Sequence, residues 1–395
     1  MMGRKIDMKK LFAVVLSLAM ILSLASCGGN AETPAASKPE EAAPAPSAPA
    51  APAAPEEAEK TEAYVATEEG LAATYEALKG KDIRVALSNS YIGNSWRAQM
   101  VNSFNGYCKW LQEQGIIKEY YSSSCGNDSD AQINEISNMI SSGYDLIVID
   151  AASPTALIPI CEEAVERGVT IVSFDSMIDD DAFYSVSMDQ YQFGYEQGTY
   201  IAEALGGKGN LINIRGVEGT TNDIVRTQGI NDAIAGTDIK IVAELWGAWD
   251  DATTASVLLD SLSSLKGTEV NAIIQAGGEN GVFEALEKVG IPLTNVVIGG
   301  DSVNGFFGKM VNENLNGIGV GCPPFLSASA VQMGLQIIAG TYEGSGTYRN
   351  LALPVIVPST AADYYDPSLP ANFNAAYTDE NNTYHLVAAE VVSAK

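Results

Sequence analysis

Short apolar runs rich in Val and Ile alternate with longer amphipathic segments from about residue 81 onward, and this alternation restricts the fold more than any other feature. The runs that we expect to form strands are 83–88, 145–150, 169–175, 210–216, 240–245, 270–277 and 295–301. Between them, apolar residues recur at spacings of three and four, and several segments end in Gly, as helices do. Near-continuous Val/Ile strands separated by helices predict parallel sheets covered on both faces.

The chain also carries a weak internal repeat. "SGYDLIVID" followed by "ERGVTIVSFD" in the first half corresponds to "VNAIIQAG" followed by "VGIPLTNVVIGGD" in the second. In both halves the second buried strand ends in an aspartate, Asp175 or Asp301. Roughly 320 residues follow Leu71, more than a single core usually supports. We therefore expect an α/β fold of two doubly wound parallel-sheet lobes, with a cleft lined by the C-terminal ends of their strands.

The N-terminal residues 1–27 have the pattern of an export signal. A basic cluster, "MMGRKIDMKK", precedes "LFAVVLSLAMILSLAS", an apolar stretch slightly short for a membrane span. The stretch ends at "LASC", which resembles the lipobox of bacterial lipoproteins and implies lipid attachment at Cys27. The alternative is a buried core helix that ends in a cysteine.

Residues 28–70 are rich in Ala, Pro and Glu and contain almost no large apolar side chains. Such a segment buries too little surface to offset its ordering entropy, so we expect a disordered, semi-extended stalk. With the lipid anchor, this stalk would place the folded part outside the cytoplasm, at the cell surface or in the periplasm, tethered to the outer face of the cytoplasmic membrane.

The formal net charge of −27 argues against binding to nucleic acid or to an anionic membrane surface. Besides Cys27 the chain has four cysteines, whose spacing fits neither a metal site nor a dense disulfide framework. Cys108 and Cys161 lie in helical patterns, where we expect them to be buried as small apolar residues. A Cys108–Cys125 bridge remains open, and the fourth cysteine is Cys322.

The stretch "SNSYIGNSWR" joins a predicted strand to a helical pattern without a glycine-rich phosphate loop. Strand-to-helix turns of this kind are where open α/β sheets bind ligands. The turn offers Asn94, Ser95, Trp96 and Arg97. Sugars present apolar faces to aromatic rings and hydroxyls to charged planar groups, so this set suits a sugar. The alternatives are an indole packed into the lobe and a solvated arginine.

Carboxylates at the ends of buried strands are costly unless they are paired or face a ligand. Asp175 and Asp301 hold such positions, although a helix cap or a turn would also explain them. Arg226 and Trp249 lie in the second half, where a surface salt bridge and a core position are the alternatives.

Catalysis is poorly supported by the sequence. The only histidine, His385, lies near the C-terminus, which argues against His-based triads and most zinc sites. "GVEGTTND" and "QAGGENG" match neither a Walker loop nor a dinucleotide fingerprint. Paired carboxylates can serve a glycosidase, but Asp175 and Asp301 are expected on opposite lobes, which suits capture. We expect no enzymatic activity, no cofactor and no bound metal.

Taken together, these motifs resemble the sugar-binding proteins of ABC importers, of the ribose- and galactofuranose-binding kind known as type 1 periplasmic binding proteins. The resemblance covers roughly residues 81–353 and rests on "SNSYIGNSWR", "IVSFDS", "RGVEGTTNDIVRTQGI", "ELWGAWD" and "VVIGGDSVNG". It implies three hinge crossings, near 186–189, 321–324 and 353–357. The implied N-terminal lobe comprises 81–188 plus 323–353, and the C-terminal lobe 189–322 plus 357–395.

The resemblance implies that Asp175, Arg226 and Asp301 bind ligand hydroxyls while Trp96 and Trp249 stack on the ring. Relatives usually carry Arg after the first of these aspartates. Here the residue is Ser176, so we expect Arg97 to substitute for the missing donor. The chain also departs from the family in "AGGEN", where relatives have Asn-Asp, and at Cys322, where they have Gln. Both changes leave the identity of the sugar open, and we expect Gly277 and Gly278 to leave room for a larger ligand.

The implied function is capture of a monosaccharide, or a similar small polyhydroxylated ligand, by hinge closure and its delivery to the membrane permease of an ABC importer. We expect a monomer without nucleic-acid partners. The alternatives are a receptor that feeds a sensor kinase or quorum pathway and a nucleoside-binding lipoprotein. The Asp/Arg clamp argues against the latter.

Overall fold

The computed structural model describes residues 68–344 and 346–375. The expected signal peptide, the lipid-attachment Cys27, nearly all of the expected stalk and His385 lie outside the described residues. Within residues 68–375, residue 345 excepted, none of the helices is both long enough and apolar enough to cross a bilayer.

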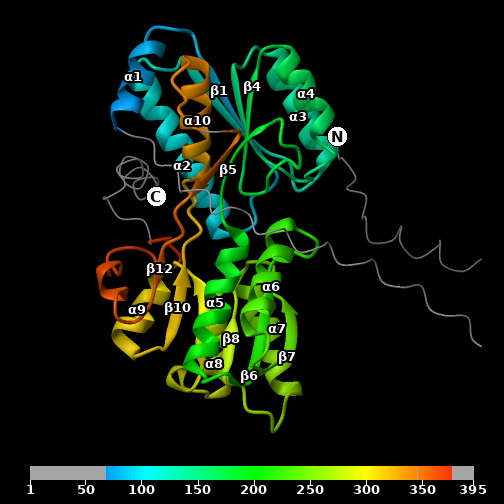
Figure 1. The fold of residues 1–395 in the computed structure, drawn as a ribbon, viewed down its shortest axis with the longest axis vertical. Helices are drawn as coiled ribbons and strands as arrows, with labels where there is room; N and C mark the ends of the chain where they lie inside the picture. Colours follow the sequence, from blue (N-terminus) through cyan, green and yellow to red (C-terminus); the bar gives the residue numbers. More distant parts are fainter. Residues whose placement is uncertain (1–67, 345, 376–395) are drawn as a thin grey trace, which may run out of the picture. The chain divides into compact units, whose positions relative to one another are not determined.

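The described chain alternates strands and helices (Figure 1). The helices are α1 (Glu68–Leu78), α2 (Ser95–Glu113), α3 (Ser129–Ser141), α4 (Ile158–Glu166), α5 (Gln190–Ala204), α6 (Thr221–Ile234), α7 (Asp251–Ser264), α8 (Glu279–Val289), α9 (Asn304–Glu313) and α10 (Leu326–Ala339), with short 3-10 turns at Leu293–Asn295 and Ala361–Asp363. The strands are β1 (Arg84–Asn89), β2 (Glu119–Ser124), β3 (Leu146–Asp150), β4 (Thr170–Phe174), β5 (Tyr184–Met188), β6 (Lys208–Arg215), β7 (Asp238–Trp246), β8 (Ala272–Ile274), β9 (Val297–Asp301), β10 (Gly317–Val320), β11 (Tyr348–Leu351) and β12 (Val355–Ile356).

The strands form two sheets of six strands each. The first has the order β11-β5-β4-β3-β1-β2, and all of its strand pairs are parallel. The second has the order β12-β10-β9-β8-β6-β7, and only its short edge strand β12 runs antiparallel. The predicted α/β fold with two parallel-sheet lobes is therefore confirmed.

Helices cover both faces of the first sheet, so its central strands are apolar on both sides. All five residues of β3 are buried, and so are four of the five in β4. One face packs on α2 and α10, and the other on α3 and α4 (Figure 1). In the second lobe, α5 and α6 cover one face of β6, β8 and β9.

The chain passes between the two lobes three times. It leaves β5 of the first sheet for α5 of the second lobe at Asp189, which caps α5 by accepting a hydrogen bond from Gln192 N. It returns through residues 321–325, between β10 and α10. It crosses again through residues 352–354, between β11 and β12.

The structure adds elements that the sequence patterns did not single out. α1 begins at Glu68, inside the range expected for the stalk, and belongs to the first lobe. The Thr74 hydroxyl bonds the Thr341 hydroxyl at 2.7 Å, and the Tyr75 hydroxyl bonds that of Tyr107 at 2.6 Å. The strands β2, β5, β10, β11 and β12 were also not among those expected.

The four cysteines of the described chain are free thiols. Cys108 and Cys161 are buried, as predicted, and burial raises the pKa of Cys161 to about 12. The disulfide between Cys108 and Cys125 that the sequence left open does not form in the structure.

Candidate ligand-binding site

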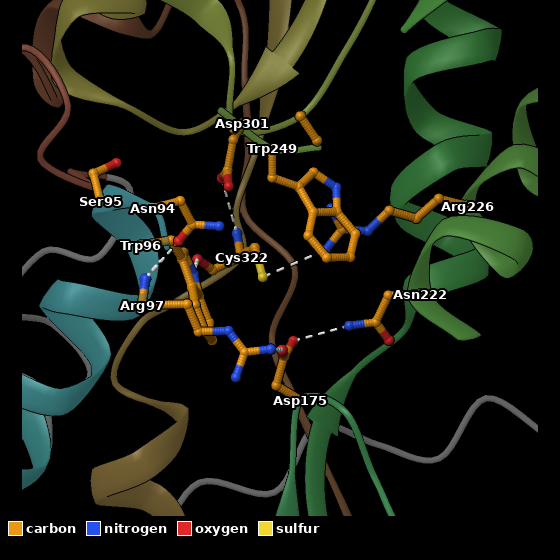
Figure 2. A pocket seen from close by; sticks show the side chains of 12 residues that line it. Asn94, Ser95, Trp96, Arg97, Asp175, Asn222, Arg226, Trp249, Asp301 and Cys322 are labelled. Carbon is orange, nitrogen blue, oxygen red and sulfur yellow. Dashed lines mark hydrogen bonds and ion pairs between the residues drawn. The ribbon is translucent and has the colours of Figure 1, made fainter. Parts of the chain in front are cut away.

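A cavity of about 440 Å³, counted with the open space at its mouth, lies where the C-terminal ends of strands from both sheets meet (Figure 2). It is lined by Asn94, Ser95, Trp96, Arg97, Asp175, Asn222, Arg226, Trp249, Ala276, Gly277, Asp301 and Cys322. The structure thus brings together every predicted site residue except Ser176.

The turn before α2 provides the first wall of the cavity. Asn94 is the N-cap of α2, and its Oδ1 accepts a hydrogen bond from Arg97 N at 2.8 Å. Trp96 Nε1 donates to the carbonyl of Cys322 at 2.8 Å. The indole is therefore attached to the second passage between the lobes, and its half-buried ring also packs against buried apolar residues.

Arg97 is buried, with 3% of its surface exposed, so the interpretation as a solvated residue is wrong. Its guanidinium pairs with Asp150 and lies 3.6 Å from Asp175 Oδ2. It also donates to Asn89 Oδ1 at 3.0 Å and to Ser176 Oγ at 3.5 Å. Arg97 therefore stands beside Asp175, the position expected of the missing family arginine.

The fully buried Asp150 is the inner partner of this ion pair. Burial raises the pKa of Asp150, and the Arg97 guanidinium opposes that shift. A buried charge without its partner is costly, so each group depends on the other.

Asp175 follows β4 with φ of 54°, a left-handed conformation that costs a non-glycine residue roughly 1–3 kcal/mol. No helix begins there, so the helix-cap interpretation is wrong. The strained backbone directs the carboxylate into the cavity, where Oδ1 accepts a hydrogen bond from Asn222 Nδ2 at 3.0 Å. Because Asn222 lies on α6, this bond joins the two lobes.

Arg226 projects from α6 and is 9% exposed, so the surface salt-bridge interpretation is wrong. Its Nε donates to Gln190 Oε1 at 2.6 Å, and its guanidinium carbon lies 4.0 Å from the Phe193 ring centre. Nη2 contacts Cys322 Sγ at 3.5 Å. Among the described residues Nη1 has no hydrogen-bond partner, so it is available to a ligand.

Asp301 is the last residue of β9, and only one of its two carboxylate oxygens accepts hydrogen bonds from the described residues. Oδ1 accepts hydrogen bonds from Ser302 N at 2.6 Å, Cys322 N at 3.3 Å and Asn374 Nδ2 at 3.2 Å. Oδ2 accepts none from the described residues, so it can receive a ligand hydroxyl. Burial raises the pKa of Asp301, while Arg226 opposes the shift.

Glu279, at the start of α8, lies behind Asp301 and is 2% exposed. Its Oε1 accepts hydrogen bonds from Asp301 N at 2.6 Å and Gly277 N at 3.1 Å. Burial, followed by the charge of Asp301, raises the pKa of Glu279 to about 7. We predicted no role for this residue, because its hydrogen bond with Asp301 N joins positions that are distant in the sequence.

Trp249 forms a wall from the second lobe and is half-buried, with φ of 55°. A Cβ at Gly216 would lie 2.0 Å from Cε2 of the indole, so only glycine allows the ring to lie there. Figure 2 shows Trp249 between Asp301 and Arg226, with Asp175 on the opposite side of the cavity.

Ser176 lines a second, wider space that adjoins the cavity and shares Arg97, Asn222 and Trp249 with it. This space measures about 1060 Å³ when counted with open solvent.

Comparison with known proteins agrees with this geometry. A family model described as a periplasmic binding protein domain matches residues 85–341. The chain belongs to the periplasmic binding protein family. The resemblance inferred from the sequence is thereby confirmed.

Two curated relatives of this periplasmic binding protein carry sugar or polyol names. A xylitol-binding protein of Mycolicibacterium smegmatis is 24% identical over 44% of this chain and 51% of its own length. A D-ribose/D-allose-binding protein of Pseudomonas aeruginosa is 29% identical over 46% of this chain and 60% of its own length. The chain thus spans about half to three fifths of the length of these relatives.

Solved structures share the fold. An ABC transporter solute binding protein from Thermobispora bispora matches with a TM-score of 0.68 and 26% identity, over 78% of this periplasmic binding protein and 95% of that chain. A galactofuranose binding protein matches with a TM-score of 0.64 and 20% identity, over 71% and 96%.

Proposed function

We propose that this chain is the solute-binding receptor of an ABC importer and captures a monosaccharide or small polyol between its lobes. One observation carries the proposal. Asp175 and Asp301, from strand ends in different sheets, line one cavity together with the indoles of Trp96 and Trp249. This combination of acceptors for hydroxyls and flat apolar surfaces for C–H faces is what a polyhydroxylated ring requires.

The roles of the polar groups follow from their free atoms. Asp301 Oδ2 accepts a ligand hydroxyl, and Arg226 Nη1 donates to a ligand oxygen. Asp175 is shared between Arg97, Asn222 and the ligand. Because these groups come from both lobes, ligand binding favours the closed form, and the closed form is what a permease recognises.

The names of the relatives support the ligand class. Curated relatives are named for xylitol, for D-ribose and D-allose, and for D-xylose. We propose further that the protein works outside the cytoplasm as a monomer, is held to the membrane through Cys27, and binds its ligand without turnover.

A thermal-shift screen tests the proposal. The panel comprises pentoses, hexoses, furanoses, polyols, a disaccharide and nucleosides. At a hundredfold excess over its dissociation constant, a true ligand stabilises the protein by about 2.7 kcal/mol. Stabilisation by one polyol or sugar that disappears in Asp175→Ala supports the proposal. If nothing in the panel stabilises the wild type, or a nucleoside alone does, the proposed ligand class is wrong.

A further inference from the structure

The chain continues beyond β12, and residues 366–375 lie against the start of α9 in the second lobe. Gly305 N donates to Ala371 O at 2.7 Å, and Ala375 N donates to Ser302 O at 2.9 Å. A Cβ at Gly305 would lie 2.8 Å from that of Ala371, so glycine permits this close approach. The segment is therefore fixed beside the strand end that carries Asp301.

Asn374 contacts Asp301 and Cys322, two residues that line the cavity, and is itself 2% exposed. Its Nδ2 donates to Asp301 Oδ1 at 3.2 Å and to Cys322 O at 3.0 Å. Its Oδ1 accepts from Ser302 Oγ at 3.0 Å. Both the nitrogen and the oxygen of the buried amide are thus hydrogen-bonded. The bond to Asp301 Oδ1 fixes the carboxylate and leaves Oδ2 for the ligand.

The same segment is also bonded to the first lobe. Gln99 lies on α2, a few residues after Trp96 and Arg97. Its Nε2 donates to Asn372 O at 2.8 Å, and its Oε1 accepts from Asn374 N at 3.1 Å. These two bonds join the lobes at a place other than the three chain passages.

We propose that residues 372–374 form a bracket in which Asn374 positions Asp301 for the ligand and Gln99 couples that position to α2. The ligand part of this inference rests on the proposed function. An acceptor held in its binding geometry loses less conformational freedom on binding, so the bracket raises affinity through preorganisation.

The exchange of an amide for a carboxylate tests the positioning role. Asn374→Asp keeps the acceptor for Ser302 and replaces the donor by an oxygen that faces Asp301 Oδ1. Asn372→Asp makes the same change at an exposed site two residues away. The probes are xylitol, D-ribose, D-allose and myo-inositol, each titrated calorimetrically against the full-length protein at pH 5 and pH 8.

We expect Asn374→Asp to weaken binding of the active probe by about tenfold or more at pH 8, because two buried carboxylates then repel each other. At pH 5 the loss of affinity should be smaller, because one carboxyl group of the pair is then protonated and donates a hydrogen bond to the other. The other titratable or charged groups near Asp301 are Glu279, Arg226 and Cys322, so each variant is compared with wild type at the same pH.

Asn374→Ala is a second control in case Asn374→Asp does not fold, because it removes the donor without adding charge. Its loss of affinity should be smaller and should not depend on pH. Asn372→Asp should bind as wild type does. Equal losses in Asn374→Asp and Asn372→Asp, or a loss that pH leaves unchanged, would overturn the positioning role.

A second test needs no ligand. Cys322 is 4% exposed and lies against the bracket, so its labelling by N-ethylmaleimide, located by peptide mass spectrometry, reports opening. Gln99→Ala should speed labelling of Cys322 by about threefold or more without changing that of the half-buried Cys125. Asn102→Ala on the same helix is the control.

Unchanged labelling of Cys322 in both Gln99→Ala and Asn374→Asp would contradict the bracket. If no sugar or polyol of the thermal-shift panel binds wild type, the proposed function fails, and the labelling experiment still decides whether the bracket holds the lobes together.

Discussion

The two lobes hold their ligand-facing carboxylates in different ways. In the first lobe, Asp175 has a strained backbone and sits beside a cation, Arg97, which itself depends on Asp150. In the second lobe, Asp301 ends a regular strand, and its anchored oxygen is held by neutral donors with Glu279 behind it. The first half is thus built on charge pairing and the second on hydrogen bonds, so the halves should fail under different perturbations.

The largest effect is expected in the first lobe from Asp150→Ala. This change leaves the buried Arg97 without its main partner, and loss of one member of a buried pair costs about 3–5 kcal/mol. The free energy of unfolding in urea measures the effect. The matched control is Glu163→Gln, which breaks the exposed pair with Arg167 and should cost about 0.5 kcal/mol or less.

If Asp150→Ala and Glu163→Gln cost the same, the ion pair is not what supports the first half of the site.

The stability of the second lobe should depend on pH through Glu279, whose pKa is raised to about 7. A carboxyl group whose folded pKa is raised binds more protons in the folded state. Its favourable contribution is therefore present below the unfolded value of about 4.3 and is lost as pH rises through about 7.

Glu279→Gln removes this titration. Relative to wild type, the variant should gain roughly 1–3 kcal/mol of unfolding free energy between pH 5 and pH 8. Urea denaturation of both proteins at the two pH values measures the difference. A difference that stays constant with pH would show that the Glu279 carboxyl does not titrate in this range.

A smaller effect is expected from the hydrogen bond that joins the two lobes. Asn222→Ala removes the hydrogen bond to Asp175 that crosses between the lobes, and a bond of this kind contributes about 1–1.5 kcal/mol. We expect the affinity for the ligand found in the screen to fall about fivefold to tenfold in calorimetric titrations. Asn231→Ala, which makes the same substitution at an exposed position of α6, is the control and should bind as wild type does.

The smallest effect is expected from the N-cap residues of α2 and α6, the two helices that carry site residues. The side chain of Asn94 caps α2 by accepting a hydrogen bond from the helix, whereas Thr220, the N-cap of α6, accepts none and donates its hydroxyl to Val217 O. Asn94→Ala should therefore lower the unfolding free energy by about 1 kcal/mol, and Thr220→Ala by less. Equal losses measured in urea would mean that the cap does not distinguish the halves.

Much of the fold could be predicted because a strand buried on both faces must be apolar throughout. β3 and β4 show this pattern directly. By contrast, β2 contains tyrosines and serines and is only partly buried, since it forms the edge of its sheet. Without a continuous apolar run, such a strand cannot be distinguished from a loop by its residue pattern.

The same distinction applies to the site. The ends of buried strands marked Asp175 and Asp301, because a carboxylate there requires a partner or a ligand. Asn222 and Glu279 read as ordinary polar residues in the first turn of a helix, and their roles depend on contacts distant in sequence. Asn374 is separated from Asp301 by 73 positions, and nothing local relates the two.

The central claim is that one carboxylate from each lobe binds the same ligand. Isothermal titration of the best sugar or polyol into wild type, Asp175→Asn and Asp301→Asn tests it most directly. We predict that each substitution alone weakens binding by about a hundredfold or more, because each removes a charged acceptor, worth roughly 1.5–3 kcal/mol, and disturbs the groups around it. Unchanged affinity in either variant would contradict the claim.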